Sequence, residues 1–354
     1  QALDQARSLR RSGDTAGADA LAGEIARIAA ARIASGQAPA AEALLAAVRE
    51  ITPLNPDALL YSGVCRQTAG EFAEAEELIR RSLTLAPGRA DAWTNLGAVQ
   101  IAQGKTVPAI ESFRKAIAIN PKAELALNNL GVALIKLRRD EEAESVLRAA
   151  LALRREFNVA AANLALVVTR RGRAAEGLAL CDEILAADPA HMDALAVRAD
   201  ALARLGRAEE GIATLRSALN IRPGEVTILN NLGNQLQENG RVTEAIAVYR
   251  RGLKEAGRSA SVWSNLGNAL TRLGQFGEAV YAYRIALECD PDMALAYSNL
   301  IVALGYQPDV SGRDLVREAC AWNERFGGRL TRRFFLNERD ADKRLRVGYL
   351  SGDF

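Results

Sequence analysis

The segment Ala92–Pro121, "AWTNLGAVQIAQGKTVPAIESFRKAIAINP", decides the fold of this chain. Two apolar stretches, each with a small residue near its centre (Gly97 and Ala109), stand on either side of Gly104. Glycine ends a helix in the left-handed conformation at little cost, and a proline such as Pro121 cannot continue one. The segment therefore predicts two short helices that pack closely, with a turn at Gly104 and a break at Pro121.

The same pattern recurs with a period of 34 residues along most of the chain. The turn glycines are Gly36, Gly70, Gly104, Gly172, Gly206, Gly240 and Gly274, and Arg138 occupies the one vacant slot. The prolines after the second helix are Pro53, Pro87, Pro121, Pro189, Pro223 and Pro291. A fixed period of this length indicates a stack of helical hairpins in which each repeat contacts only its neighbours.

Two further registers hold small side chains, which let the two helices of a hairpin approach each other. In the first helix they are Ala29, Gly63, Gly97, Gly131, Ala165, Ala199, Gly233 and Gly267. In the second helix they are Ala41, Ala75, Ala109, Ala143, Gly177, Gly211, Ala245 and Ala279. Larger residues are expected to fill the rest of the core: Trp93, Leu96, Phe113, Trp263, Leu266 and Tyr283.

This pattern resembles the tetratricopeptide repeat, whose signature is W-x2-L-G-x2-Y…A-x3-F…P. The segments Ala92–Pro121 and Val262–Pro291 match it best. The resemblance implies an all-α fold, a right-handed superhelix with a long concave surface, followed by a short C-terminal α/β stub. The expected domains are an N-terminal capping helix over 1–21, eight repeats over 22–293, capping helices over 294–330, and a linker with a first strand over 331–354.

One register of the first helix carries asparagine at almost every repeat, just before the core leucine. Its members are Asn95, Asn129, Asn163, Asn231, Asn265 and Asn299, and Val197 interrupts it. Arrays of this kind bind polypeptides on the face built by the first helices. Because a carboxamide both donates and accepts hydrogen bonds, the row predicts a ladder that holds an extended polypeptide backbone. The alternative interpretation is that these asparagines only reflect the repeat consensus.

Composition narrows the class of function. The formal net charge is +2, which argues against a dedicated nucleic-acid surface. A basic register (Arg80, Arg114, Arg148, Arg216, Arg250 and Arg284) is interpreted as a solvated face rather than a nucleic-acid stripe, because acids stand nearby. Four scattered cysteines and one histidine predict no metal site and free thiols in a reducing cytoplasm. No stretch has the roughly 20 apolar residues that a membrane span needs.

After Leu304 the period fails. The turn-rich "GYQPDV" (Gly305–Val310) is followed by Ser311, a predicted N-cap, and by a predicted helix over 312–326 that can close the last repeat. A polar linker, "NERDADKR", then leads into "RLRVGYLSGDF" (Arg344–Phe354). Its apolar run 345–350 predicts a strand buried on both faces, the first of an α/β domain.

This order of parts resembles the junction in O-GlcNAc transferases of the SPINDLY type, although Gly352 stands where bacterial relatives usually carry proline. The resemblance implies that the parent protein transfers a sugar to Ser or Thr of proteins. The implied donor is UDP-GlcNAc, with GDP-fucose as the alternative. The repeats would then be the arm that binds the acceptor polypeptide, and this chain itself would hold no catalytic residue and no cofactor.

A second interpretation comes from a different class: a non-catalytic scaffold that assembles partner proteins. Both interpretations predict polypeptide partners in the concave groove, with neither nucleic acid nor membrane as a partner. A homo-oligomer is compatible with both, since the open N-terminal end and the convex helices can pair.

Overall fold

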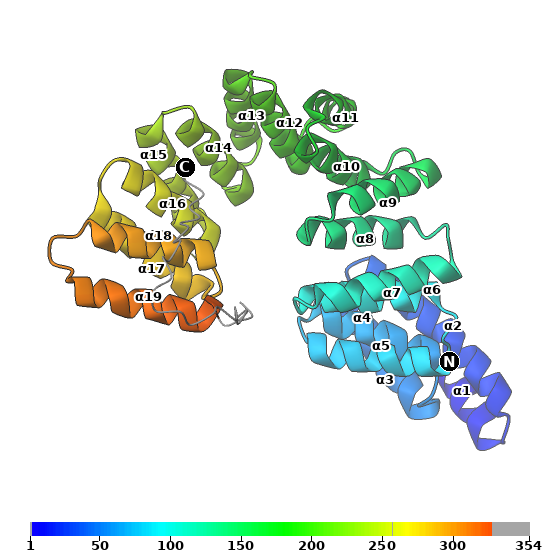
Figure 1. Ribbon diagram of the computed structural model, residues 1–354. Helices are drawn as coiled ribbons and strands as arrows, with labels where there is room; N and C mark the ends of the chain where they lie inside the picture. The colour runs from blue at the N-terminus through cyan, green and yellow to red at the C-terminus, as the bar shows by residue number, and fades with distance from the viewer. Residues whose placement is uncertain (1, 257, 328–354) are drawn as a thin grey trace, which may run out of the picture. The chain divides into compact units, whose positions relative to one another are not determined.

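The computed structural model describes residues 2–256 and 258–327, and every regular element in them is a helix (Figure 1). The helices form two compact units that divide between Arg241 and Val242. The all-α repeat architecture expected from the sequence is confirmed. The predicted linker over 331–354 and its strand over 345–350 lie outside the described residues.

The first unit contains fourteen helices among its described residues. They are α1 (Ala2–Arg11), α2 (Thr15–Ala34), α3 (Ala38–Ile51), α4 (Pro56–Thr68), α5 (Phe72–Leu85), α6 (Ala90–Ala102), α7 (Thr106–Ile119), α8 (Glu124–Lys136), α9 (Asp140–Leu153), α10 (Asn158–Arg170), α11 (Ala174–Ala187), α12 (Met192–Arg204), α13 (Ala208–Ile221) and α14 (Val226–Glu238). The segment 1–21, expected as one capping helix, holds α1 and also the start of α2, because the chain turns at Gly13 with a φ of 86°.

The second unit begins a new hairpin and ends on the helix that was expected to close the stack. Its helices are α15 (Val242–Ala256), α16 (Ala260–Arg272), α17 (Phe276–Cys289), α18 (Ala294–Gly305) and α19 (Gly312–Phe326). The Ser311 side chain accepts a hydrogen bond from the backbone N–H of Asp314, and the Asp314 carboxylate accepts one from the backbone N–H of Ser311. This capping box fixes where α19 begins, as the sequence predicted.

Helix α19 packs on the first helix of the last hairpin. The Trp322 Nε1–H donates to the backbone oxygen of Ala294 at 3.2 Å. The Tyr297 hydroxyl donates to the Glu318 carboxylate at 2.9 Å. These two bonds join the first turn of α18 to Glu318 and Trp322 of α19, an arrangement that agrees with the expected packing of this helix on the last repeat.

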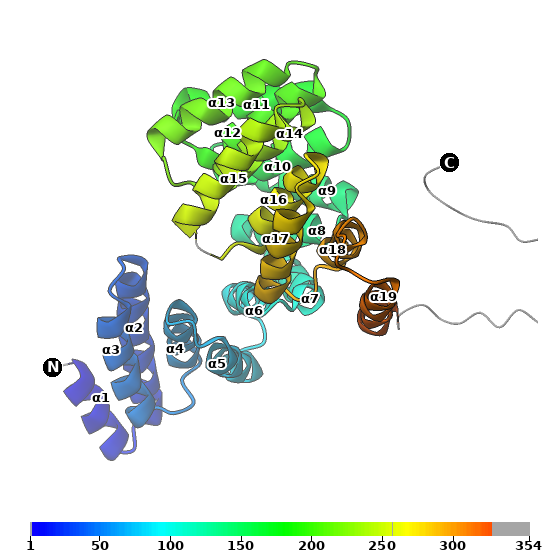
Figure 2. The ribbon, with the colours of Figure 1, turned by 90° about the vertical axis from the view of Figure 1, so that its left-hand side faces the viewer.

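First and second helices play different parts in the stack of the first unit. Each helix packs against the next one along the chain, and each first helix from α2 to α12 also packs against the first helix of the following repeat. Successive second helices of the described residues lie farther apart from each other. In Figure 2, for example, the first helices α2 and α4 lie between the second helices α3 and α5. The layer in which helices lie closer together is the concave one, so the first helices build the inner face.

The turn inside each hairpin has the conformation that the glycine register predicted. All seven period glycines have positive φ, from 71° at Gly274 to 85° at Gly172. Arg138, in the vacant slot, adopts the same left-handed conformation with a φ of 60°, and no other described residue besides glycine has a positive φ. A Cβ makes this region costly, so the fold imposes a strained backbone at Arg138.

We expect the substitution Arg138→Gly to raise the free energy of unfolding. Glycine removes the left-handed strain of about 1–2 kcal/mol. Part of this gain is offset because glycine gives the unfolded chain more conformational freedom. The net gain should be about 0.5–1 kcal/mol, measured by urea unfolding followed by circular dichroism. The matched control is Gly104→Ala, which should lose stability. Equal stability of Arg138→Gly and the parent protein would contradict this account.

Side-chain size is matched across each hairpin. A Cβ added to Gly97 would lie 2.5 Å from the ring of Phe113, and one added to Gly267 would lie 2.6 Å from the ring of Tyr283. Both rings are almost completely buried. Where the first helix carries Ala165, the facing residue is the smaller Cys181. Glycine therefore stands where a large side chain occupies the interhelical space, whether an aromatic ring or, opposite Gly63 and Gly131, the aliphatic Ile79 and Leu147. Trp93 and Trp263, expected in the core, are only half-buried.

Arg80, Arg114, Arg148 and Arg250 of the basic register pair with carboxylates of the same or of the following second helix. Arg114 pairs with Glu142 at 3.1 Å, Arg148 with Glu176 at 2.5 Å, and Arg250 with Glu278 at 2.7 Å. Each of these pairs bridges two successive second helices. The interpretation of this register as a solvated face agrees with these pairs, because a stripe that binds phosphates needs uncompensated cations.

The structure also bears on two sequence expectations, the lack of a membrane span and the state of the cysteines. No helix of the described residues is long and apolar enough to cross a membrane. The four cysteines carry free thiols: Cys65 and Cys181 are buried, Cys289 is half-buried and Cys320 is exposed. Burial raises the pKa of the Cys65 thiol to about 11 and that of Cys181 to about 12, so these two are unreactive structural residues.

Candidate binding groove on the first helices

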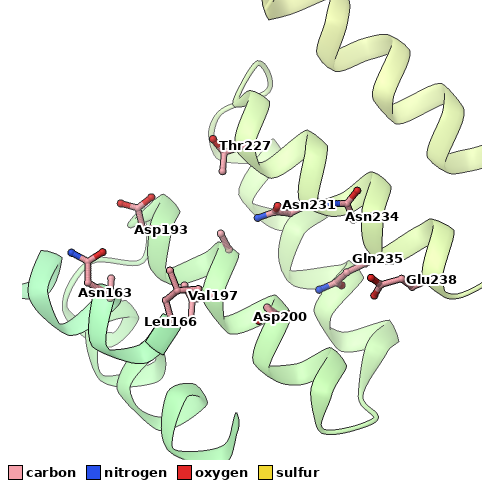
Figure 3. Close-up of a pocket in the computed structure, with 12 residues that line it drawn as sticks. Asn163, Leu166, Asp193, Val197, Asp200, Thr227, Asn231, Asn234, Gln235 and Glu238 are labelled. Atoms are coloured by element: carbon pink, nitrogen blue, oxygen red, sulfur yellow. The ribbon is translucent and has the colours of Figure 1, made fainter. Parts of the chain in front are cut away.

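The inner face of the first unit contains a cavity of about 380 Å³ whose lining comes only from α10, α12 and α14 (Figure 3). These are the first helices of three successive repeats. The name first-helix groove is used here for this cavity. Leu166 and Val197 supply apolar surface, and polar side chains surround them. A polar rim over an apolar floor is typical of ligand-binding sites.

Two members of the predicted ladder, Asn163 and Asn231, line this groove together with Val197 from the position that interrupts the row. All six ladder asparagines are half-buried, and each one directly precedes a buried leucine, as the repeat register requires. The other four are Asn95 on α6, Asn129 on α8, Asn265 on α16 and Asn299 on α18. The structure thus brings Asn163 and Asn231 into one cavity and does not place the remaining members in it.

A second set of asparagines holds the ladder side chains in place. The Asn163 Nδ2 donates to the Oδ1 of Asn128 at 3.0 Å, across the contact between α10 and α8. In the second unit, the Asn299 Nδ2 donates to the Oδ1 of Asn268 at 2.9 Å. Asn128 is only 5% exposed. An asparagine has two N–H donors and one carbonyl, so one internal bond fixes the carboxamide while leaving it further capacity.

The groove is negatively charged. Asp193, Asp200 and Glu238 line it, and none of the described lining residues is cationic. Asp200 pairs with Arg204 at 2.9 Å, whereas Asp193 and Glu238 have no ion-pair partner among the described residues. The described residues contain no group of three or more His, Cys, Asp or Glu side chains that could hold a metal ion. The arrangement is therefore built for hydrogen bonding and charge recognition.

Gln235 is the exceptional residue of the groove. Its side chain lines the cavity from α14, it is only 6% exposed, and its Oε1 has no hydrogen-bond partner. The same register in the other repeats is apolar, exposed at Ala31 of the first repeat and buried in the rest: Cys65, Val99, Ala133, Val167, Ala201, Ala269 and Ala303. A Cβ added to Gly211 of α13 would lie 2.8 Å from this Oε1, so the carboxamide fits between the groove and the second helix.

Comparison with known proteins agrees with this architecture. Models of the tetratricopeptide repeat match residues 32–99, 169–232 and 230–294, which together make up more than half of the chain. The chain is a tetratricopeptide-repeat protein. A model of the middle tetratricopeptide-like domain of cilia and flagella-associated protein 70 also matches residues 66–165. No protein with curated annotation is similar enough in sequence to match.

Two solved structures share the fold of this tetratricopeptide array. A tetratricopeptide repeat protein from Parabacteroides merdae superposes with a TM-score of 0.63 at 17% identity, over 70% of this chain and 98% of that chain. A chain of the APC/C hetero-tetramer Cut9–Hcn1 superposes with a TM-score of 0.56 at 17% identity, over 75% of this chain. The superposition covers 52% of the Cut9–Hcn1 chain, about half its length. At this identity the similarity shows the fold alone.

Sequence reasoning missed most of the lining of the tetratricopeptide groove, including all of its charged residues and its buried carboxamide: Asp193, Asp200, Glu238 and Gln235. Asn234, three residues after the ladder position Asn231 on α14, also lines it. A column-by-column comparison of the repeats would have found Gln235, because it is the one polar residue of a buried apolar register. Asp200 and Glu238 carry no such signal, since charged residues are common near helix ends.

Proposed function

We propose that this tetratricopeptide-repeat protein is a polypeptide-binding scaffold, and that an extended segment of a partner protein occupies the first-helix groove. The observation that supports the proposal is the convergence of Asn163 and Asn231 on one cavity of the inner layer. Their carboxamides can pair with the N–H and C=O groups of an extended backbone, while Leu166 and Val197 cover its apolar side chains. Such binding depends little on the sequence of the partner.

The test is the affinity for unstructured polypeptides. A display library of random 12-residue peptides should yield binders to the full chain, and the double substitution Asn163→Ala/Asn231→Ala should weaken them about 10- to 100-fold. Each lost hydrogen bond in a desolvated groove contributes about 1 kcal/mol or more, and 1.4 kcal/mol corresponds to a factor of ten. Affinities are measured by isothermal titration calorimetry.

The matched control is Asn220→Ala, because Asn220 is an exposed asparagine on the second helix α13. It should leave affinity unchanged. Peptide binding that survives the double substitution would mean that the asparagine row is only repeat consensus. A library that yields no binder would contradict the scaffold function itself.

A second candidate, the acceptor-binding arm of a protein O-glycosyltransferase, builds on the same groove. It is supported by the helix α19 (Gly312–Phe326, N-cap Ser311) after the last repeat, because the resemblance to the SPINDLY-type junction includes a helix at this place. In this candidate the repeats present acceptor Ser or Thr residues to a catalytic domain. That domain would bind the donor, UDP-GlcNAc or alternatively GDP-fucose.

An assay of sugar transfer separates the two candidates. The full-length parent protein is incubated with radiolabelled UDP-GlcNAc or GDP-fucose and a peptide selected by the groove. Transfer to Ser or Thr that falls with Asn163→Ala/Asn231→Ala supports the glycosyltransferase arm. Peptide binding without transfer from either donor contradicts the arm and leaves the scaffold.

A further inference from the structure

The first-helix groove contains a polar group that the fold has not satisfied. Gln235 occupies a register that is otherwise apolar and, except at Ala31, buried, so the packing of the repeat does not require a carboxamide there. A buried oxygen without a partner is unfavourable for folding, and such groups in native structures call for an explanation. A ligand that enters the groove and donates a hydrogen bond provides one. Rotation of the carboxamide about its last bond exchanges its oxygen and nitrogen, so either can face the cavity.

Carboxylates stand near this group in the same cavity. Asp200 from α12 and Glu238 from α14 line the groove with Gln235 (Figure 3). None of the described lining residues is cationic, but Arg204, outside the lining, pairs with Asp200, whereas Glu238 has no ion-pair partner among the described residues. Asp200 is bound on one side by Arg204, which fixes its orientation. Two carboxylates and an amide oxygen form an acceptor set for a group with several N–H donors and a positive charge.

The floor of the groove suits the rest of such a side chain. Leu166 and Val197 present apolar surface from α10 and α12. Lysine and arginine cover apolar surface with their methylene stems while their charged ends reach polar partners. An acidic side chain of a ligand would instead meet like charges, and a purely apolar one would leave the Gln235 oxygen without a partner.

We propose that the side pocket formed by Asp200, Gln235 and Glu238 selects a lysine or arginine side chain of the bound polypeptide. This inference rests on the proposed function, because it assumes that a polypeptide backbone lies along Asn163 and Asn231. The side pocket would make binding selective for the residue at one position of the partner, whereas the asparagine ladder by itself has almost no sequence selectivity. The partner is therefore a protein with an extended segment that carries a basic residue.

The experiment uses the peptides selected by the full chain from the random 12-residue library. Lysine and arginine should be enriched at one fixed position, and replacing that residue by norleucine, an uncharged counterpart of lysine, should weaken binding about tenfold. A glutamate there should weaken binding further. Because partly exposed charges are screened by salt, the difference between lysine and norleucine should shrink as ionic strength rises.

Three substitutions test the pocket itself. Gln235→Ala restores the residue type found in this register at Ala201 and Ala269, so it should fold normally and lose most of the preference for lysine. Asp200→Asn/Glu238→Gln should also abolish the preference. The matched control is Glu141→Gln, since Glu141 lies on the second helix α9 and its side chain is 87% exposed. This control should keep the parent preference.

The outcomes distinguish this inference from the proposed function. Peptides that bind through Asn163 and Asn231 but tolerate norleucine or glutamate at every position would overturn the basic pocket and leave the scaffold function in place. A preference for lysine that persists in both pocket variants would overturn it as well. A library that yields no binder would overturn both proposals together.

Discussion

Replacing Phe113 by alanine is expected to lower the free energy of unfolding by about 3–5 kcal/mol, the usual cost of deleting a buried aromatic ring. Phe113 is among the largest fully buried side chains, and its ring occupies the space that Gly97 leaves between α6 and α7. Urea unfolding followed by circular dichroism measures the change. Val107→Ala on the same helix is the control, because Val107 is 61% exposed and should change stability by less than about 0.5 kcal/mol.

The substitution Gly97→Ala tests the same contact from the other helix, because the close approach of the helices predicts that it destabilises the protein rather than stabilising it. In an ordinary helix interior, glycine to alanine raises stability by about 1 kcal/mol. Here the new Cβ would lie 2.5 Å from the Phe113 ring, so overpacking should instead cost about 1–3 kcal/mol. Combining it with Phe113→Leu should recover part of the loss, since the smaller residue makes room. A stabilising Gly97→Ala would show that the helices do not approach as closely as described.

Removing Asp140 is expected to lower the free energy of unfolding by about 2–3 kcal/mol, somewhat less than for a fully buried ion pair. The Arg170 guanidinium lies 3.0 Å from the Asp140 carboxylate, and their side chains are only 12% and 20% exposed. Burial lowers the pKa of Arg170, and nearby Arg138 and Arg204 act in the same direction. Asp140 is the carboxylate that stabilises this buried cation most, and Asp200 adds a smaller contribution, so Asp140→Ala leaves Arg170 with only part of its compensation.

A double-mutant cycle separates this pair from its surroundings. The combination Asp140→Ala/Arg170→Met should be less destabilising than Asp140→Ala alone, because it also removes the buried cation. The exposed pair Arg207–Glu210, at 2.7 Å with 47% and 56% exposure, is the control, and Glu210→Ala should change the free energy of unfolding far less than Asp140→Ala. Additive losses for Asp140 and Arg170 would mean that the two side chains do not act as a pair.

The architecture could be predicted because the same pattern of helix, turn and break residues recurs many times along the chain. A single Gly104 or Pro121 is weak evidence, but the same residue types at seven turns and six breaks leave one period. The turn at Arg138 shows the strength of this periodic signal. The period predicts a left-handed backbone conformation at this position, and Arg138 adopts it although it is not a glycine. The boundary near 1–21 was less accurate, since α2 begins at Thr15 before the first recognisable repeat residue.

The site was less accessible from the sequence. The row of asparagines could be read from the register, but the sequence assigns all six the same environment. Only the packed helices show that Asn163 and Asn231 line one cavity and that Asn128 holds Asn163. These facts depend on distances between helices that are more than thirty residues apart in the chain.

The sequence by itself determined the helical hairpins, their period, their turns and the register that faces inward, because these follow from local backbone preferences repeated many times. The tertiary structure decided which inward residues share a cavity. It placed Gln235, whose side-chain oxygen has no partner, in one cavity with Asp200, Glu238, Leu166 and Val197. That arrangement exists only where three first helices meet, since burial and charge in a groove belong to the stack and not to any one repeat.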